Sequence, residues 1–140
     1  MIVSLHKHLV IAAYFLVILL FTNMASAKQP AKVAIHINNP LKMTMLVNNV
    51  KNMRKVLGPE AKIIVVVNGP AVARFTKMSQ SRAQLDSILS DNAEVAICSI
   101  ALKNKKIAKS SLYKGMNYLE NGGAAKLVEL QHEGYAYIKP

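Results

Sequence analysis

Apolar residues fall into short blocks between polar turn signals, and the spacing within each block predicts its structure. The segments "KVAIHIN" (32–38) and "KIIVVVN" (62–68) are rich in β-branched residues, which favours strands. The second is apolar throughout its centre, as expected of a strand that helices cover on both faces. "EVAICSI" (94–100) predicts a third strand, and "MNYL" (116–119) and "YAYIK" (135–139) predict two shorter ones.

Helical spacing appears between these strands. Apolar residues recur at steps of four, three and four after the first strand, namely at Leu46, Val50, Met53 and Leu57. Asn39 as N-cap and Pro40 at the first helical position predict where this helix starts, and Gly58 predicts its end. A second helix is expected over 81–90, with Leu85, Ile88 and Leu89 facing inward.

A third helix is expected from an Asn121 cap to a stop at Gly134, and 71–78 is ambiguous between helix and loop. Strands that alternate with helices predict an α/β fold. We expect a three-layer α/β/α sandwich around a mostly parallel sheet of about five strands.

The first 27 residues have the features of a signal peptide. Lys7 precedes an uninterrupted apolar run over 9–21, which is too short to span a bilayer comfortably. Ala25 and Ala27 then form a small-x-small cleavage site, so we expect the mature chain to start at Lys28 and to be exported to the periplasm. An uncleaved membrane anchor is the alternative.

The chain is strongly basic, with a net charge of +11. Of its 18 Lys and Arg residues only Lys7 precedes Lys28, so 17 basic side chains stand against 7 acidic ones in the mature chain. The only dense cluster is "KNKK" (103–106), and no aromatic stripe accompanies it. We therefore expect a solvated basic surface, no nucleic-acid partner and no membrane attachment after cleavage. Salt-sensitive association with anionic membranes is a further alternative.

Cys98 is the only cysteine, so an internal disulfide is excluded. Two interpretations stay open for it. A thiol that faces a helix N-terminus is favoured as the reactive thiolate, whereas a buried cysteine often serves as a small hydrophobe.

Ligands of open α/β sheets bind beyond the carboxyl ends of the strands. Polar and small residues are expected there beside Cys98, and the candidate binding residues are Asn38, Asn68, Gly69, Pro70 and Ser99. The two histidines after residue 27, His36 and His132, lack metal-ligand spacing, so we expect neither a metal nor a cofactor. His36 is expected to be packed or hydrogen-bonded. A Cys–His pair requires the fold to bring one of these histidines to Cys98.

Several segments resemble the DsrE/DsrF-like sulfur-relay family, in particular its small exported members. The resemblance rests on "KVAIHINNP", "LVNNVKNM" with Asn48, Asn49 and Asn52, "KIIVVVNGPAV", "VAICSIALKNKKI" and the final "LQHEGYAYIKP". It covers residues 28–140 nearly end to end, and we predict a DsrE/DsrF-like domain there.

The resemblance implies a homotrimer or related homo-oligomer. It also implies that Cys98 carries sulfane sulfur as a persulfide, exchanged with a donor or acceptor protein. Asn68, Gly69 and Pro70 match the loop that the family places after the second strand. Many relatives have histidine where Asn68 stands and glycine where Ala71 stands. The alternative is therefore a non-enzymatic module that binds a small anion or a protein on the same fold, with weakened or lost sulfur transfer.

Overall fold

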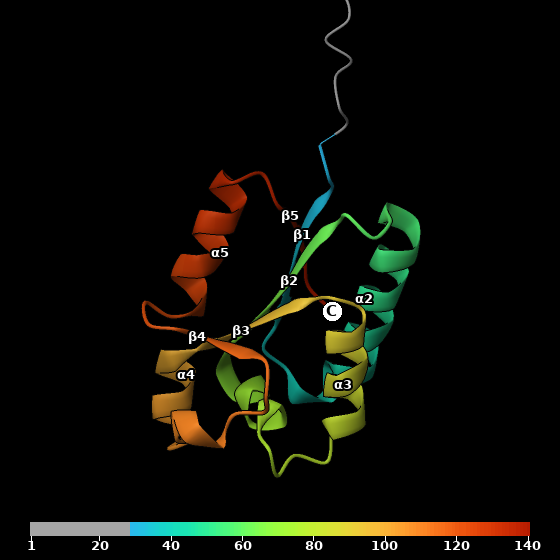
Figure 1. Cartoon of the computed structure of the whole chain (residues 1–140). Helices are drawn as coiled ribbons and strands as arrows, with labels where there is room; N and C mark the ends of the chain where they lie inside the picture. The colour runs from blue at the N-terminus through green and yellow to red at the C-terminus, as the bar shows by residue number, and fades with distance from the viewer. Residues whose placement is uncertain (1–28) are drawn as a thin grey trace, which may run out of the picture.

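The computed structural model describes residues 29–140, so the predicted signal peptide lies outside the described residues. Its centre is one five-stranded sheet between helices (Figure 1). The strands are β1 (Lys32–Ile37), β2 (Lys62–Val67), β3 (Glu94–Cys98), β4 (Met116–Leu119) and β5 (Ala136–Ile138). Their order across the sheet is β4-β3-β2-β1-β5, and every neighbouring pair is parallel.

The helices are α2 (Met43–Leu57), α3 (Arg82–Ser90), α4 (Ser99–Asn104) and α5 (Gly123–His132). Helices α2 and α3 cover one face of the sheet and α5 covers the other, which is the predicted three-layer α/β sandwich (Figure 1). No helix within residues 29–140 is long and apolar enough to cross a membrane.

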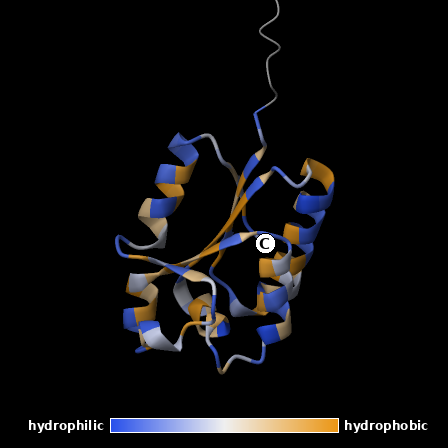
Figure 2. Cartoon of the chain, viewed as in Figure 1, coloured by the Kyte–Doolittle hydropathy of each residue, from blue (hydrophilic) through white to orange (hydrophobic). Residues whose placement is uncertain are grey.

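The central strand β2 shows how the two layers share one sheet. Val65 and Val67 pack into the core under α2 and α3, whereas Ile64 and Val66 pack into the core under α5. Successive strand residues point to opposite faces, so both faces of β2 must be apolar. The apolar colouring of the central strands follows from this double burial (Figure 2).

The ambiguous segment is a 3-10 helix over Gly69–Phe75, which buries Phe75 completely. The backbone N–H of Tyr113 donates to the Phe75 carbonyl at 2.9 Å, and Thr76 pairs with Leu112 in an isolated antiparallel bridge. This segment therefore closes the carboxyl end of the sheet against the chain that follows α4.

Three sequence predictions need correction. The strand predicted over 94–100 ends at Cys98, because Ser99 and Ile100 already belong to α4. The predicted Asn121 cap is wrong: Gly122 holds the N-cap position of α5, without a side-chain hydrogen bond. Leu57 ends α2 with 37% of its surface exposed, so the buried face of that helix stops before its last turn.

The predicted cap of the first helix is confirmed, but the capped turn is a 3-10 turn that precedes the α-helix. Asn39 caps a 3-10 turn over Pro40–Lys42, where its Oδ1 accepts the N–H of Leu41 at 2.9 Å. The α-helix follows directly at Met43. The predicted helix over 81–90 is α3, in which Leu85 and Ile88 are fully buried.

Candidate functional site

Cys98 ends β3 and leads into α4. Its side chain is 3% exposed, and the backbone N–H of Ala101 donates to Sγ at 3.4 Å. The cysteine thus occupies the N-cap position of α4, where serine or aspartate would ordinarily accept such an N–H. The same backbone donor that caps the helix is available to a negatively charged sulfur.

Two glycines bring the start of α5 against this thiol. A Cβ added at Gly123 would lie 3.3 Å from Cys98 Cβ, 3.4 Å from Val66 Cγ1 and 3.5 Å from Asn68 Cβ. Any larger residue would have to displace these neighbours. Gly123 therefore lets the first turn of α5 lie directly on the carboxyl ends of β2 and β3.

Gly122 forms the wall nearest to the sulfur. Its φ of +84° is a conformation that side-chain-bearing residues rarely adopt, and an added Cβ would lie 3.7 Å from Cys98 Sγ. The same Cβ would meet Ile100 Cδ1 at 2.8 Å, so the Ile100 side chain lies across Gly122. Ile100 is 56% exposed, so an exposed apolar side chain lies beside the glycine that is nearest to the thiol.

Ser99 fixes the start of α4 to the segment that leads into Gly122. Its side chain is 9% exposed, and its Oγ donates to the Glu120 carbonyl at 2.9 Å. This bond joins the residue after Cys98 to the segment between β4 and α5. Ser99 thereby positions the site, as a buried hydroxyl with its hydrogen bond satisfied.

The predicted residues after β1 and β2 meet one another. Asn68 Oδ1 accepts the N–H of Gly69, whose φ of +52° suits glycine, and the Asn38 carbonyl accepts the N–H of Ala71 at 3.2 Å. Of these residues, Asn68 lies nearest to Cys98, because Gly123 lies against the Cβ atoms of both side chains. Asn38 follows β1 and so lies one strand further from Cys98, whereas Gly69 follows Asn68 after β2, and Pro70 is exposed.

A Cys–His pair does not form. His36 Nδ1 lies 2.9 Å from the Tyr137 hydroxyl on β5, on the side of β1 away from β3, which confirms that it is hydrogen-bonded. His132 ends α5, about 14 Å along the helix from its start beside Cys98. Among residues 29–140, no three His, Cys, Asp or Glu side chains are grouped so that they could hold a metal ion.

Protonation of His36 is expected to destabilise the fold. Burial, and next the charge of Lys139, lower the pKa of His36 below its usual 6.5, and Nε2 is buried without a partner. The unfolded chain therefore binds the proton more readily, so this stability is present above about pH 6.5 and is lost as pH falls toward the folded pKa. Denaturant unfolding at pH 7.5 and 5.5 should show a larger loss in the wild type than in His36→Asn. Equal losses would contradict this.

Replacing Ile100 with alanine is expected to expose the thiol. The side chain that crosses Gly122 beside Sγ would be gone, so a disulfide reagent should modify Cys98 several-fold faster in the folded protein. Val128→Ala is the matched control, because Val128 is similarly exposed, at 58%, on α5. An unchanged rate in Ile100→Ala would show that another group limits access to the sulfur.

Sequence reasoning found Cys98 and Ser99 but missed the roles of Gly122, Gly123 and Ile100. The signal in the sequence was the glycine pair in "NGG", directly before the apolar helical pattern. Two adjacent glycines at a helix start indicate close backbone approach as well as a turn.

Comparison with solved structures supports the fold. Protein MTH1491 from Methanobacterium thermoautotrophicum, of unknown function, superposes with a TM-score of 0.73 at 24% identity, over 79% of this chain and 99% of that one. The ychN protein from E. coli gives a TM-score of 0.65 at 12% identity, over 79% and 99% of the two chains. BT1422 from Bacteroides thetaiotaomicron, also of unknown function, gives 0.63 at 18% identity, over 84% and 100%.

No protein-family model matches the chain, and no curated protein matches it either. The likeness to the three solved structures covers nearly their whole length at low identity. It shows that this chain has their α/β fold.

Proposed function

We propose that this chain is an exported DsrE/DsrF-like protein that binds or transfers sulfane sulfur through a persulfide on Cys98. The observation that carries the proposal is the placement of the thiol. Sγ lies at the carboxyl end of a central strand, accepts a backbone N–H from Ala101, and is walled by the two glycines that begin α5. The family resemblance of the sequence supports the same chemistry.

In the proposed reaction, the Cys98 thiolate attacks the outer sulfur of a persulfide or polysulfide donor. The Cys98 S–S bond forms as the donor's S–S bond breaks, and the donor leaves as a thiolate. The Ala101 N–H donates to the reacting sulfur, and Ser99 holds the strand-to-helix turn through the Glu120 carbonyl. Because the thiol is 3% exposed, a neighbouring group must move before a donor can reach it, and we expect this group to be the exposed Ile100 side chain beside Gly122.

The alternative is a non-enzymatic module that binds a small anion or a protein without sulfur transfer. The observation that favours it is the burial of Cys98, which packs into the apolar core with Ile97 and Leu102. A structural cysteine of this kind would cap α4 and fill space without reacting.

Mass spectrometry after exposure to polysulfide separates the two functions. A persulfide carrier should gain the mass of one sulfur atom, lose it to added thiol, and show no gain as Cys98→Ser. Ser99→Ala is a useful second variant, because it keeps the thiol and loosens the turn that holds it. If the folded wild type gains no sulfur without reductant present, the binding module is the better description.

The proposal includes export and self-association. N-terminal sequencing of the protein from the producing cell should begin at Lys28, and light scattering should give the mass of a trimer or related homo-oligomer. Recovery of the intact N-terminus in the membrane fraction would replace the cleaved signal with an anchor. A monomeric mass would remove the oligomer from the proposal.

A further inference from the structure

The positive charge of the folded chain is concentrated at one end of the sheet. All five strands are parallel, so their carboxyl ends share one edge, and the segments that follow β1 to β4 gather there. We call the basic side chains of these segments the carboxyl-edge cluster: Lys42, Arg74, Lys77, Arg82, Lys103, Lys105, Lys106 and Lys109. Two acidic residues lie in the same segments: Glu120 pairs with Lys109 at 3.7 Å, and Asp86 follows Arg82 by one turn on α3 and accepts the Tyr113 hydroxyl.

At the amino edge of the sheet, by comparison, basic and acidic side chains are nearly equal in number. Acidic residues lie just before β2, β3 and β5, at Glu60, Asp91, Glu94 and Glu133. They face a similar number of basic residues around the same strand starts, one of which, Arg54, is occupied by backbone carbonyls. The excess charge therefore resides at the carboxyl edge and gives the molecule a strong electrostatic direction.

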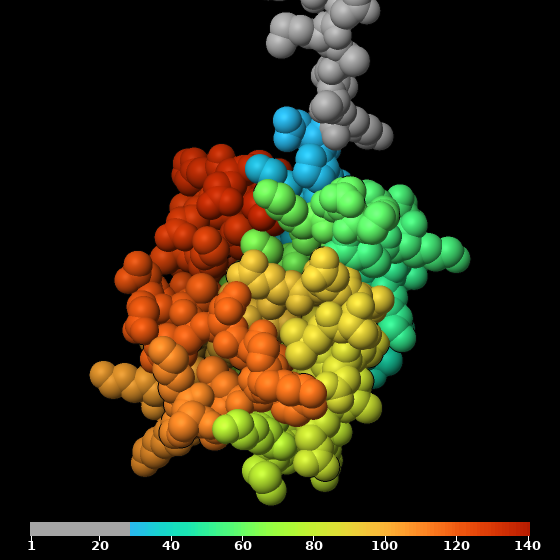
Figure 3. All heavy atoms as spheres, viewed as in Figure 1, coloured from blue at the N-terminus to red at the C-terminus, as the bar shows by residue number. Residues whose placement is uncertain are grey.

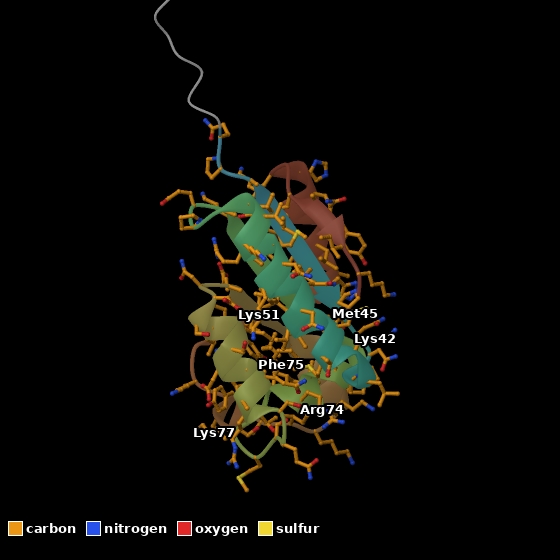
Figure 4. The ribbon with its side chains drawn as sticks, turned by 90° about the vertical axis from the view of Figure 1, so that its right-hand side faces the viewer. Lys42, Met45, Lys51, Arg74, Phe75 and Lys77 are labelled. Carbon is orange, nitrogen blue, oxygen red and sulfur yellow. The ribbon has the colours of Figure 1, made fainter. Side chains whose placement is uncertain are left out.

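Large apolar side chains protrude within the same cluster. Leu41 is 81% exposed beside Lys42, and Met78 is 88% exposed beside Lys77. Met45, 44% exposed, lies in the first turn of α2 above Lys42 (Figure 4). Single exposed apolar residues are ordinary, but here the two most exposed ones of residues 29–140 both stand inside the basic surface.

The segments that carry these residues form one continuous end of the molecule. The 3-10 segment after β2 contacts both α4 and the turn that holds Lys42. Figure 3 shows the segments that follow β2 and β3 side by side at the lower end of the molecule, and Figure 4 places Arg74 and Lys77 toward that end, with Lys42 higher, just before α2. The exposed side chains of Leu41 and Met78 therefore adjoin cationic residues in the segments at this end of the molecule.

We propose that this carboxyl edge binds peripherally to the surface of an anionic phospholipid bilayer. Lysine and arginine would lie in the headgroup layer, and Leu41 and Met78 would insert at the acyl boundary. The two apolar side chains stand in separate segments, one after β1 and one after β2, which suits a fluid interface better than a shaped protein partner. Of the two aromatic residues in these segments, Phe75 is buried and Tyr113 is half-buried with its hydroxyl on Asp86, so neither is presented as an open platform for nucleic-acid bases.

The inference does not depend on the chemistry of Cys98. Cys98→Ser should bind vesicles as the wild type does, because the thiol is buried. Failure of sulfur transfer would therefore leave the membrane surface standing, and failure of vesicle binding would leave sulfur transfer standing. The proposed membrane surface replaces two expectations from the sequence, namely that the basic surface is only solvated and that the mature chain makes no membrane contact.

Vesicle sedimentation of the chain that starts at Lys28 tests the proposal directly. Vesicles of phosphatidylcholine with about 30% phosphatidylglycerol should bind the protein, pure phosphatidylcholine should not, and about 0.5 M NaCl should release it. The double variant Lys42→Gln/Arg74→Gln should lose binding about tenfold. Its control, Lys55→Gln/Lys62→Gln, removes the same charge from the amino edge and should bind nearly as the wild type does.

Insertion is tested separately with Leu41→Ser/Met78→Ser, which leaves every charge in place. This variant should bind several-fold more weakly, and circular dichroism should be unchanged because both side chains are exposed. The proposal is overturned if anionic vesicles do not bind, if the two charge variants lose binding equally, or if the apolar variant binds fully. Binding to an acidic protein or to heparin without binding to vesicles would also overturn it.

Discussion

Replacing Arg54 with alanine should lower the free energy of unfolding by about 3 kcal/mol or more, because it would strip several backbone carbonyls of their donors. Arg54 Nε donates to the Asp91 carbonyl at 2.8 Å, and Nη2 donates to the Asn92 carbonyl at 3.0 Å. Nη1 lies 3.0, 2.7 and 2.9 Å from the carbonyls of Gly58, Pro59 and Ala61.

These carbonyls belong to two loops whose backbones are not joined by the hydrogen bonds of the sheet. Gly58, Pro59 and Ala61 lie between α2 and β2, whereas Asp91 and Asn92 lie between α3 and β3. One guanidinium therefore ties the last turns of α2 and α3 together at the amino edge. A planar cation with five N–H donors suits this arrangement, and hydrogen bonds from a charged donor are stronger than neutral ones.

Denaturant unfolding of Arg54→Ala, Arg54→Lys and Lys55→Ala measures this role. Lysine keeps the charge but has three donors on one atom, so Arg54→Lys should recover only part of the stability. Lys55 is the exposed neighbour on α2, and its truncation should change the free energy of unfolding by less than about 0.5 kcal/mol. If Arg54→Ala were as stable as Lys55→Ala, the carbonyl cluster would carry no measurable stability.

The layered fold could be predicted because burial leaves a strong pattern in the sequence. β2 is apolar on both faces and is buried on both faces, and the helical steps of Leu46 and Val50 match the buried face of α2. The short helix α4 was not predicted. Its six residues follow the apolar run of β3 without a break, so Ser99 and Ile100 continue the strand pattern although the chain has turned.

The candidate site was predictable as a location but not as an arrangement. Parallel strands place Cys98, Asn68 and Asn38 at one edge, which the element order alone implies. The contact between Ile100 and Gly122 joins two segments on either side of β4, and no local pattern records such a meeting. The hydrogen bond of Ser99 to the Glu120 carbonyl was hidden for the same reason.

The charge distribution shows the same limit of sequence reading. Along the chain the basic residues are scattered, with only 103–106 dense, and this favoured a uniformly solvated surface. Folding brings the turns after four strands to one edge, so residues as distant as Lys42 and Lys106 belong to one cluster. The net charge was readable from composition, and its location required the topology.

Deleting residues 135–140 is expected to destabilise the fold severely, because this tail is the edge strand of the sheet. β5 pairs in parallel with β1 through Val33 and Ala136, and through Ile35 and Ile138. The pattern "YAYIK" also predicts that Tyr135 or Tyr137 is buried, and the buried one is Tyr135, which is 7% exposed, whereas Tyr137 is 45% exposed. Loss of the segment would uncover β1 and the apolar layer beneath α5.

Two point variants separate the buried side chain from the strand itself. Tyr135→Ala should cost about 3 kcal/mol, because it opens a cavity in the layer that Tyr135 shares with Leu130 and Ala34. Tyr137→Ala, the matched control two residues away, removes an exposed ring and the hydrogen bond to His36, and should cost about 1 kcal/mol. Melting temperature and light-scattering mass should be measured together, since the edge strand can also support an oligomer. An unchanged melting temperature and mass in the deletion variant would show that the tail is dispensable, and equal losses in the two tyrosine variants would show that burial of Tyr135 is not what anchors it.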